Sequence, residues 1–379
     1  MDYPSKKLKK MDDATCISSL PQEIILKILA CLPPKSAVSF RCTSKFFQTF
    51  IPQPHFKFRM LFWFPFTNLY TVGFTTEESH GRLQPSSLQC SADELQRFKQ
   101  LIGSSFADGK LCLINRWGET TILDLSTRQY ICLPLVEPGD LWTKMYFGAA
   151  LGFDPVSKRY KVLRSELYRN NTHPYYQGML KVLTLGVDES WRAVTTDYSF
   201  LACQPIASVQ IDGIIYLKMH CRDKQEIVVF DIETENLIRV IPFPYIFRVM
   251  PTMYYSSWVK LNGRLAYIYV DVKRRTRIFV CNLEKSLGPG WDKHEIPLTL
   301  EEAKIIRQAE SVSITANSIG EIVFLIQAKN MSPSILIYAC GPQVWRKFEI
   351  CELPGYSSSQ SWRRINTVHV MEEKVYFSE

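Results

Sequence analysis

Apolar residues recur with two different spacings along this chain of 379 residues. Between residues 18 and 58 they lie three or four positions apart, the spacing of one face of an α-helix. From residue 108 onward they form runs of four to eight residues between Asp-Gly and Asn-Gly turns, which is typical of strands. The change predicts a small helical domain followed by a large all-β domain.

The first predicted helix carries one apolar stripe. Its members are Leu20, Ile24, Ile28 and Leu32. Pro21 suits the first turn of a helix, and the pair Pro33 and Pro34 must end it. Two further short segments, 35–42 and 44–51, complete a three-helix unit. A unit of this size buries little surface by itself. We therefore expect it to pack against a partner or against the next domain.

The β region repeats with a period of about 50 residues. A turn glycine precedes an apolar strand at Gly109, Gly213, Gly263 and Gly320, with intervals of 104, 50 and 57 residues. A degenerate unit beginning at Phe153-Asp154-Pro155 fills the double interval. A second marker, an aromatic residue or leucine, opens the last strand of each unit at Tyr130, Trp191, Leu237, Trp291 and Trp345. Two markers in register predict kelch-like units of four strands, and therefore a β-propeller.

Five complete units are predicted, at 104–134, 147–196, 206–243, 256–298 and 311–350. Residues 365–377 hold only two strands, so we expect two strands from residues 56–74 to complete the last of about six blades and close the ring between the chain ends. Residues 75–100 are expected to form a loop with one short helix. An irregular pair of β-sandwiches is the alternative that this pattern leaves open.

Charge and composition narrow the class of protein. The net charge is +8, of which residues 1–10 carry +3, so the body is only mildly basic. The lysines of this start, Lys6, Lys7, Lys9 and Lys10, form either a disordered basic tail or a nuclear-import patch. No bilayer-spanning run, no secretory leader and no Cys-x-x-Cys pair is present, so we expect an intracellular protein of nucleus or cytoplasm, with no membrane partner and with reduced thiols.

Sequence motifs for catalysis are missing. The chain contains no Gly-x-Ser-x-Gly, no His-Glu-x-x-His and no phosphate-binding glycine loop, and its six histidines are scattered. We therefore expect no catalytic residue, no metal and no cofactor. Two alternatives stay open: a propeller enzyme whose site is assembled from distant loops, and a nucleic-acid binder that uses the basic segment 273–277 beside Tyr267, Tyr269 and Phe279.

The repeat register also locates a candidate recognition surface. Loops joining the second and third strands of each unit should emerge on one rim of the ring, at 116–119, 164–178, 219–226, 271–277 and 327–334. They vary in length and together carry a net charge of +5. Variable loops on a rigid scaffold are where binding residues concentrate. The candidate target-binding residues are Trp117, Tyr168, Tyr175, Tyr176, Arg274 and Arg275.

Two stretches resemble known families. Leu20-Pro21-Gln22-Glu23-Ile24-Ile25, Ile28-Leu29, Leu32-Pro33 and Phe40-Arg41-Cys42 resemble an F-box, with departures at Thr43, Phe47 and Phe50, where that family usually has valine, tryptophan and leucine. Gly152-Phe153-Asp154-Pro155, Ser190-Trp191-Arg192 and Val229-Phe230-Asp231 look like the F-box-associated domain of plant F-box proteins.

The resemblance implies a basic tail at 1–17, an F-box at 18–58 and an F-box-associated, propeller-like domain at 59–379. It implies a non-catalytic substrate-recognition subunit of a Skp-cullin-F-box E3 ubiquitin ligase, which binds the Skp adaptor, through it the cullin, and a target protein. A propeller binding module outside a ligase is the alternative. The adaptor-binding residues would be Leu20, Pro21, Ile24, Ile28, Leu32 and Pro33, a set suited to helix-in-groove recognition.

Overall fold

The computed structural model describes residues 20–30, 57–63, 69–76, 78, 80–87, 101–135, 144–169, 176–195, 203–221, 224–243, 254–272, 275–283, 290–328, 332–351 and 367–373. The chain divides into two compact units. One comprises residues 1–57 with 373–379, and the other comprises residues 58–372. Each is described by itself.

In the first unit, helix α1 (Gln22–Ala30) follows Pro21, as the sequence predicts. The Pro21 carbonyl accepts hydrogen bonds from the backbone N–H groups of Ile24 and Ile25, which starts the helix. Ile25 is buried, whereas Ile24 and Ile28 are 42% and 48% exposed. The two exposed isoleucines are four residues apart and therefore share one face. Residues 31–56, which include Leu32, Pro33 and the other two predicted helices, lie outside the described residues, as do the four lysines near the start.

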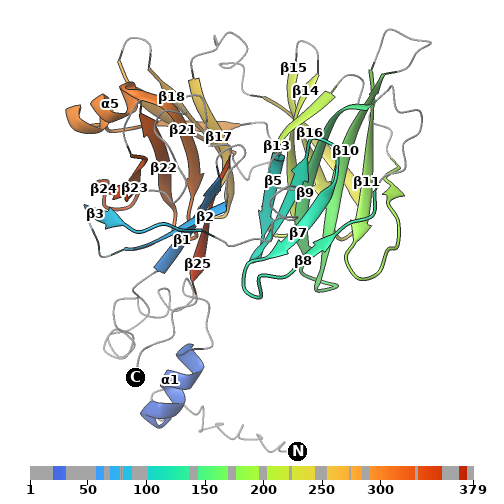
Figure 1. The fold of residues 1–379 in the computed structure, drawn as a ribbon, viewed down its shortest axis with the longest axis horizontal. Coiled ribbons are helices and arrows are strands. Elements are labelled where there is room, and N and C mark those ends of the chain that lie inside the picture. The colour runs from blue at the N-terminus through green and yellow to red at the C-terminus, as the bar shows by residue number, and fades with distance from the viewer. Residues whose placement is uncertain are drawn as a thin grey trace, which may run out of the picture. The chain divides into compact units, whose positions relative to one another are not determined.

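In the second unit, the described strands form six sheets, the blades of a β-propeller (Figure 1). Blade 1 contains β5 (Leu101–Ala107), β6 (Lys110–Asn115), β7 (Thr120–Asp124) and β8 (Tyr130–Cys132). Blade 2 contains β9 (Lys144–Asp154), β10 (Arg159–Arg169), β11 (Tyr176–Thr184) and β12 (Arg192–Ala193). Blade 3 contains β13 (Cys203–Ile211), β14 (Ile214–Cys221), β15 (Lys224–Asp231) and β16 (Asn236–Pro242).

Blade 4 contains β17 (Tyr254–Leu261), β18 (Arg264–Asp271), β19 (Arg277–Leu283) and β20 (Trp291–Ile296). Blade 5 contains β21 (Ala309–Ala316), β22 (Glu321–Ala328), β23 (Ser334–Ala339) and β24 (Val344–Ile350). Blade 6 contains β25 (Thr367–Glu373), β1 (Lys57–Trp63), β2 (Leu69–Thr75) and β4 (Ser86–Ser87). The five repeat units predicted from the sequence each form one sheet, so the β-propeller prediction is confirmed and the paired β-sandwiches are excluded.

Both sequence markers of the repeat have a structural cause. Asp108, Asp212 and Asn262 have positive φ and each is followed by a glycine with positive φ, the backbone of the tight turn between the first two strands. The indole N–H of Trp191 donates to the Pro134 carbonyl at 2.8 Å, and that of Trp345 donates to the Pro297 carbonyl at 2.9 Å. Each of these tryptophans therefore joins its own blade to the blade before it.

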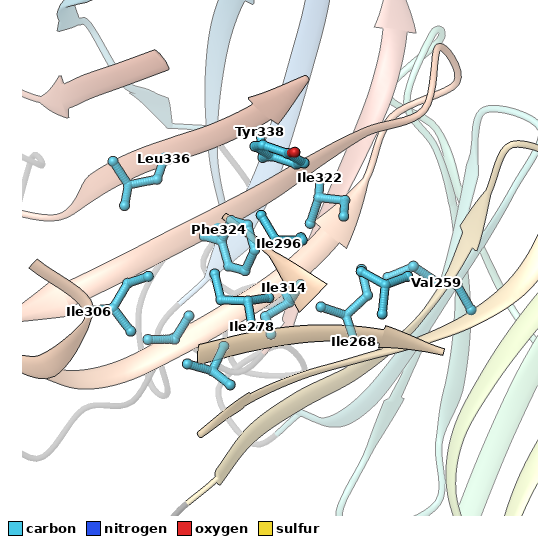
Figure 2. Close-up of a cluster of buried hydrophobic side chains, with 14 of the residues drawn as sticks. Val259, Ile268, Ile278, Ile296, Ile306, Ile314, Ile322, Phe324, Leu336 and Tyr338 are labelled. Carbon is cyan, nitrogen blue, oxygen red and sulfur yellow. The ribbon is translucent and has the colours of Figure 1, made fainter. Parts of the chain in front are cut away.

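The hydrophobic core lies between blades. First strands of successive blades are neighbours, from β5 through β9, β13 and β17 to β21, and Figure 1 shows β5, β9 and β13 beside one another. A large cluster between blades 4 and 5 contains Ile268, Ile278, Ile314 and Phe324 (Figure 2). Residues on both faces of the second strands β18 and β22 are buried, so these blades depend on their neighbours to cover apolar side chains.

The sheet of blade 6 combines β25 with three strands from residues 57–87, in the order β25-β1-β2-β4. Residues 375–377, where a further strand was predicted, lie outside the described residues. The segment after β2 is not only a loop, because β3 (His80–Leu83) pairs in parallel with β24 and gives blade 5 a fifth strand. The expectation of a loop was therefore wrong for β3 and β4; residues 88–100 lie outside the described part of the chain.

His369 of β25 contacts the first strand of blade 1. Its Nε2 atom lies 2.8 Å from the Ser104 hydroxyl, and its ring centroid lies 5.8 Å from that of Phe106. The imidazole is partly buried, and burial lowers its pKa from the ordinary 6.5 to about 4. The neutral ring is therefore the form that the folded protein favours.

Because the unfolded chain takes up this proton at a higher pH than the folded protein, the contribution of His369 to stability is full above pH 6.5 and is lost as the pH falls toward 4. We expect the free energy of unfolding of the wild type to decrease more steeply over this window than that of His369→Gln. Urea denaturation at several pH values measures both. Parallel profiles would contradict the assignment.

Candidate target-binding rim

The connections between second and third strands lie on one rim of the propeller. Successive strands within blades 1–5 are antiparallel, so these connections leave the end opposite to the tight glycine turns. We call this surface the loop rim; the residues on it that the structure describes are 116–119, 272, 275–276 and 332–333. The opposite surface, which carries the glycine turns, is called the turn rim.

One predicted loop is shorter than expected. Strands β10 and β11 stay paired as far as Arg169 and Tyr176, so residues 164–169 and 176–178 of the predicted loop are strand. Tyr168 pairs with Gln177, which places Tyr168 and Tyr176 at the end of a hairpin instead of in a long loop. Tyr175 lies outside the described residues, as does Arg274.

Trp117 sits on a rigid turn. The Asn115 side-chain oxygen accepts the backbone N–H groups of Trp117 at 3.0 Å and Glu119 at 2.9 Å, and the Asn115 amide donates to the Glu119 carboxylate at 2.6 Å. Gly118 has a φ of +82°, which closes the turn. The Trp117 side chain is nevertheless 57% exposed, with the Arg116 guanidinium 5.9 Å from its ring centroid. Such a side chain is presented to a partner at small entropic cost.

A buried arginine supports the same turn from the next blade. Arg164 of β10 is 2% exposed and donates to the Gly118 carbonyl at 2.5 Å. Its Nε donates to Glu166 at 2.8 Å, and Lys181 lies 3.1 Å from the same carboxylate. These paired charges satisfy one another in a site with little water. The sequence pattern predicts that Arg164 begins a surface loop. Charged residues in this part of β10 interrupt the alternation of apolar and polar positions by which a strand is recognised.

Helix α5 (Leu300–Arg307) was missed from the sequence and lies in the connection between blades 4 and 5. Thr299 and Glu302 form a capping box, a signal that could have found it. Its Ile306 is fully buried in the cluster shown in Figure 2. The hydroxyl of Thr276 donates to the carbonyl of Ala303 at 3.4 Å, so α5 lies against the loop rim beside Arg275.

The aromatic residues that motivated a nucleic-acid site are core residues. Tyr267 and Tyr269 are 7% and 2% exposed, and Lys293 covers the ring of Phe279 at 4.2 Å. Bases stack on exposed rings, so these residues do not form a stacking platform. Lys218 also lies over rings, 5.1 Å from that of Phe243, and burial lowers its pKa to about 8.

The described residues also bear on metal binding, thiol reactivity and the presence of membrane-spanning helices. No group of three or more His, Cys, Asp or Glu side chains in that part of the chain could hold a metal ion. Burial raises the pKa of the Cys112 thiol to about 12 and that of Cys281 to about 11, so both are poor nucleophiles at neutral pH. No helix among these residues is long and apolar enough to cross a membrane.

The described strands form a propeller scaffold, with the connections between second and third strands on one rim. Residues 59–375 match the F-box associated beta propeller domain, and residues 17–59 match the F-box domain. The chain therefore belongs to the F-box proteins that carry an F-box associated β-propeller. This combination fits, in general, the role of a substrate adaptor in Skp-cullin-F-box ligases.

The relatives are plant proteins. A chain from Arabidopsis thaliana assigned to the F-box proteins is 26% identical over 402 residues, covering 94% of this chain and 91% of its own length. An F-box protein from the same plant is 26% identical over 354 residues, covering 80% and 69%. Among solved structures, the Dos1 propeller overlaps with a TM-score of 0.36 at 11% identity, covering 73% of this chain and 64% of its own, too low a similarity to carry an argument.

We expect Arg164→Met to lower the free energy of unfolding by about 2 to 4 kcal/mol, because it removes the hydrogen bond to the Trp117 turn and takes the arginine partner away from the buried Glu166 carboxylate. Arg159→Met, an exposed position on the same strand, serves as the matched control and should change stability by less than about 0.5 kcal/mol. Chemical denaturation of the two variants measures the difference. Equal losses would show that Arg164 is not a support of the turn.

Proposed function

We propose that this protein is the substrate-recognition subunit of a Skp-cullin-F-box E3 ubiquitin ligase. The F-box binds a Skp-family adaptor and through it the cullin, and the propeller holds the protein to be ubiquitinated. One observation carries the proposal: an F-box match at residues 17–59 is followed directly by the F-box associated propeller match at 59–375. The subunit itself is a receptor and not a catalyst. It acts in the nucleus, the cytoplasm or both.

The adaptor side of the proposal is supported by helix α1. Ile24 and Ile28 are apolar, exposed and on one face. Burial of each such side chain in a groove contributes roughly 1.5 to 3 kcal/mol. Together with these two isoleucines we assign Leu20, Pro21, Leu32 and Pro33 to adaptor binding.

The target side is assigned to the loop rim. Tryptophan, tyrosine and arginine dominate the energetics of protein interfaces, and the exposed Trp117 and Arg275 lie on this rim. We assign target binding to Trp117, Tyr168, Tyr175, Tyr176, Arg274 and Arg275. The lysines Lys6, Lys7, Lys9 and Lys10 are assigned to nuclear import.

The domain boundaries and ring closure belong to the same proposal. We assign residues 1–17 to a tail, 18–58 to the F-box and 59–379 to the propeller, whose last blade is closed by strands from the N-terminal side. The pairing order β25-β1-β2-β4 and the contact of His369 with Ser104 support closure at this point.

Deleting residues 365–379 should expose the edge of β1 and uncover the side chains of β5 that His369 contacts, and unpaired strand edges associate with other chains. We therefore expect the truncated protein to aggregate, as size-exclusion chromatography with light scattering would show. A monomeric truncated protein with an unchanged melting temperature would contradict closure by β25.

The variant Leu20→Ala with Pro21→Ala should abolish adaptor binding and leave the propeller folded. Removing a buried leucine from a well-packed site costs roughly 2 to 5 kcal/mol, which is about thirtyfold or more in affinity. Affinity purification of the full chain with mass spectrometry measures adaptor and target together.

The matched control is Glu23→Ala with Lys27→Ala, two exposed positions on the same helix. This control should keep the adaptor, and both variants should keep the target. Adaptor recovery equal to wild type from the Leu20 and Pro21 variant would refute the assignment. A wild-type chain that captures a target but no adaptor would favour a propeller module that acts outside a ligase.

A further inference from the structure

A hollow on the loop rim lies beside helix α5. It has a volume of about 280 Å³ and is bounded by the start of β19, the end of β20 and the residues after it. Its lining consists of Arg275, Thr276, Arg277, Glu295, Ile296, Pro297 and Leu298. Sites for cofactors and drug-sized molecules usually enclose about 300 to 1,000 Å³. The hollow is therefore of a size for one or two side chains of a bound protein.

The walls of the hollow are held in place from behind. Ile296 is buried in the cluster between blades 4 and 5 (Figure 2), and Leu298 packs against the same cluster. The indole of Trp345 bonds the Pro297 carbonyl, and the hydroxyl of buried Thr276 bonds the backbone of α5. A pocket fixed in this way is preorganised for a ligand.

The lining has a basic wall and an apolar wall. Arg275 is exposed, and Arg277 reaches Glu295 only at 3.9 Å, with both side chains about half exposed. Such an exposed ion pair is weak, so the arginine can exchange this partner for another carboxylate. Arginine matches the planar shape of a carboxylate and can bind it through two parallel hydrogen bonds. Pro297 and Leu298 supply the apolar wall.

We propose that this hollow binds an acidic segment of the target protein, with the carboxylate of an aspartate or glutamate on Arg275 and Arg277 and a neighbouring apolar side chain against Pro297 and Leu298. The inference rests on the proposed function, because it names the chemistry of the target. The two arginines outnumber Glu295, so the lining can take one carboxylate, whereas a phosphate backbone would bring a series of negative charges against Glu295. The apolar wall has no role in binding a free inorganic anion.

The experiment uses the immobilised full-length protein and a library of short synthetic peptides with randomised positions, with bound peptides identified by mass spectrometry. We expect enrichment of aspartate or glutamate beside leucine, isoleucine or phenylalanine. Arg275→Glu with Arg277→Glu should remove this enrichment and weaken a selected peptide by about fivefold or more for each reversed charge. Added salt should weaken binding to the wild type.

The matched control is Arg128→Glu with Arg264→Glu, the same change of charge at two exposed arginines of the turn rim; it should leave peptide binding unchanged. Both double variants should keep the wild-type melting temperature and adaptor binding, which reports on the F-box and not on the hollow. A labelled single-stranded oligonucleotide serves as the competing ligand.

Selection of basic peptides, or no compositional bias, would overturn the inference. Oligonucleotide binding that exceeds peptide binding and depends on the same arginines would also overturn it. A further outcome is that acidic peptides are still enriched by the double arginine variant but not by Trp117→Ala. That result would place peptide binding at Trp117 and overturn the inference about this hollow, while the proposed function would be unaffected. Failure of the wild type to bind the adaptor would instead count against the proposed function alone.

Discussion

Each blade of this propeller depends on its neighbours to bury the apolar side chains on its faces. A four-stranded sheet has two faces, and apolar side chains occupy both. Buried polar bonds cross the same seams: Lys161 of blade 2 donates to the carbonyl of Ile232 at 2.8 Å, and Arg346 of blade 5 donates to that of Thr75 at 2.7 Å. An unpaired charge in such a place is costly, so these bonds favour one register between the blades that they join.

The loop rim inherits its rigidity from these seams. The turn that carries Trp117 is fixed by Arg164 from the adjacent blade, and the hollow beside Arg275 has walls bonded to α5 and to blade 5. The exposed groups on this rim are therefore held by pairs of blades and not by single loops. The supporting residues lie behind the rim, so the exposed side chains can be substituted with little effect on the scaffold.

Much of this architecture could be predicted from the sequence. Turns such as Asp108-Gly109 need positive φ, and few residues other than glycine, asparagine and aspartate adopt it, so they mark each hairpin. Trp191 and Trp345 mark outer strands because each bonds the previous blade. The candidate site was predicted in part: Trp117 is on an exposed turn as expected, whereas Tyr168 lies in a strand.

The remaining features have physical causes that a local pattern does not contain. Arg164 and Glu166 are charged residues, so a hydropathy pattern predicts that they are exposed. In the structure they are buried, because they form an ion pair with each other. Strand β3 reads as a polar connection, since its pairing partner β24 lies more than 260 residues away in the chain. The hollow is lined by residues around the start of β19 and by residues at and just after the end of β20. These two segments come together only in the folded blade.

The pairing of β3 with β24, and of β1 with β25, sets the order in which the protein can mature. At about 5 to 20 residues per second, the ribosome delivers β25 roughly 15 to 60 s after β1. During that interval the apolar strands β1 and β2 have been made, but their blade is incomplete, and incomplete sheets attract chaperones as well as other chains. Blade 6 can therefore be completed only after β25 has been synthesised, whichever of the other five blades have already formed.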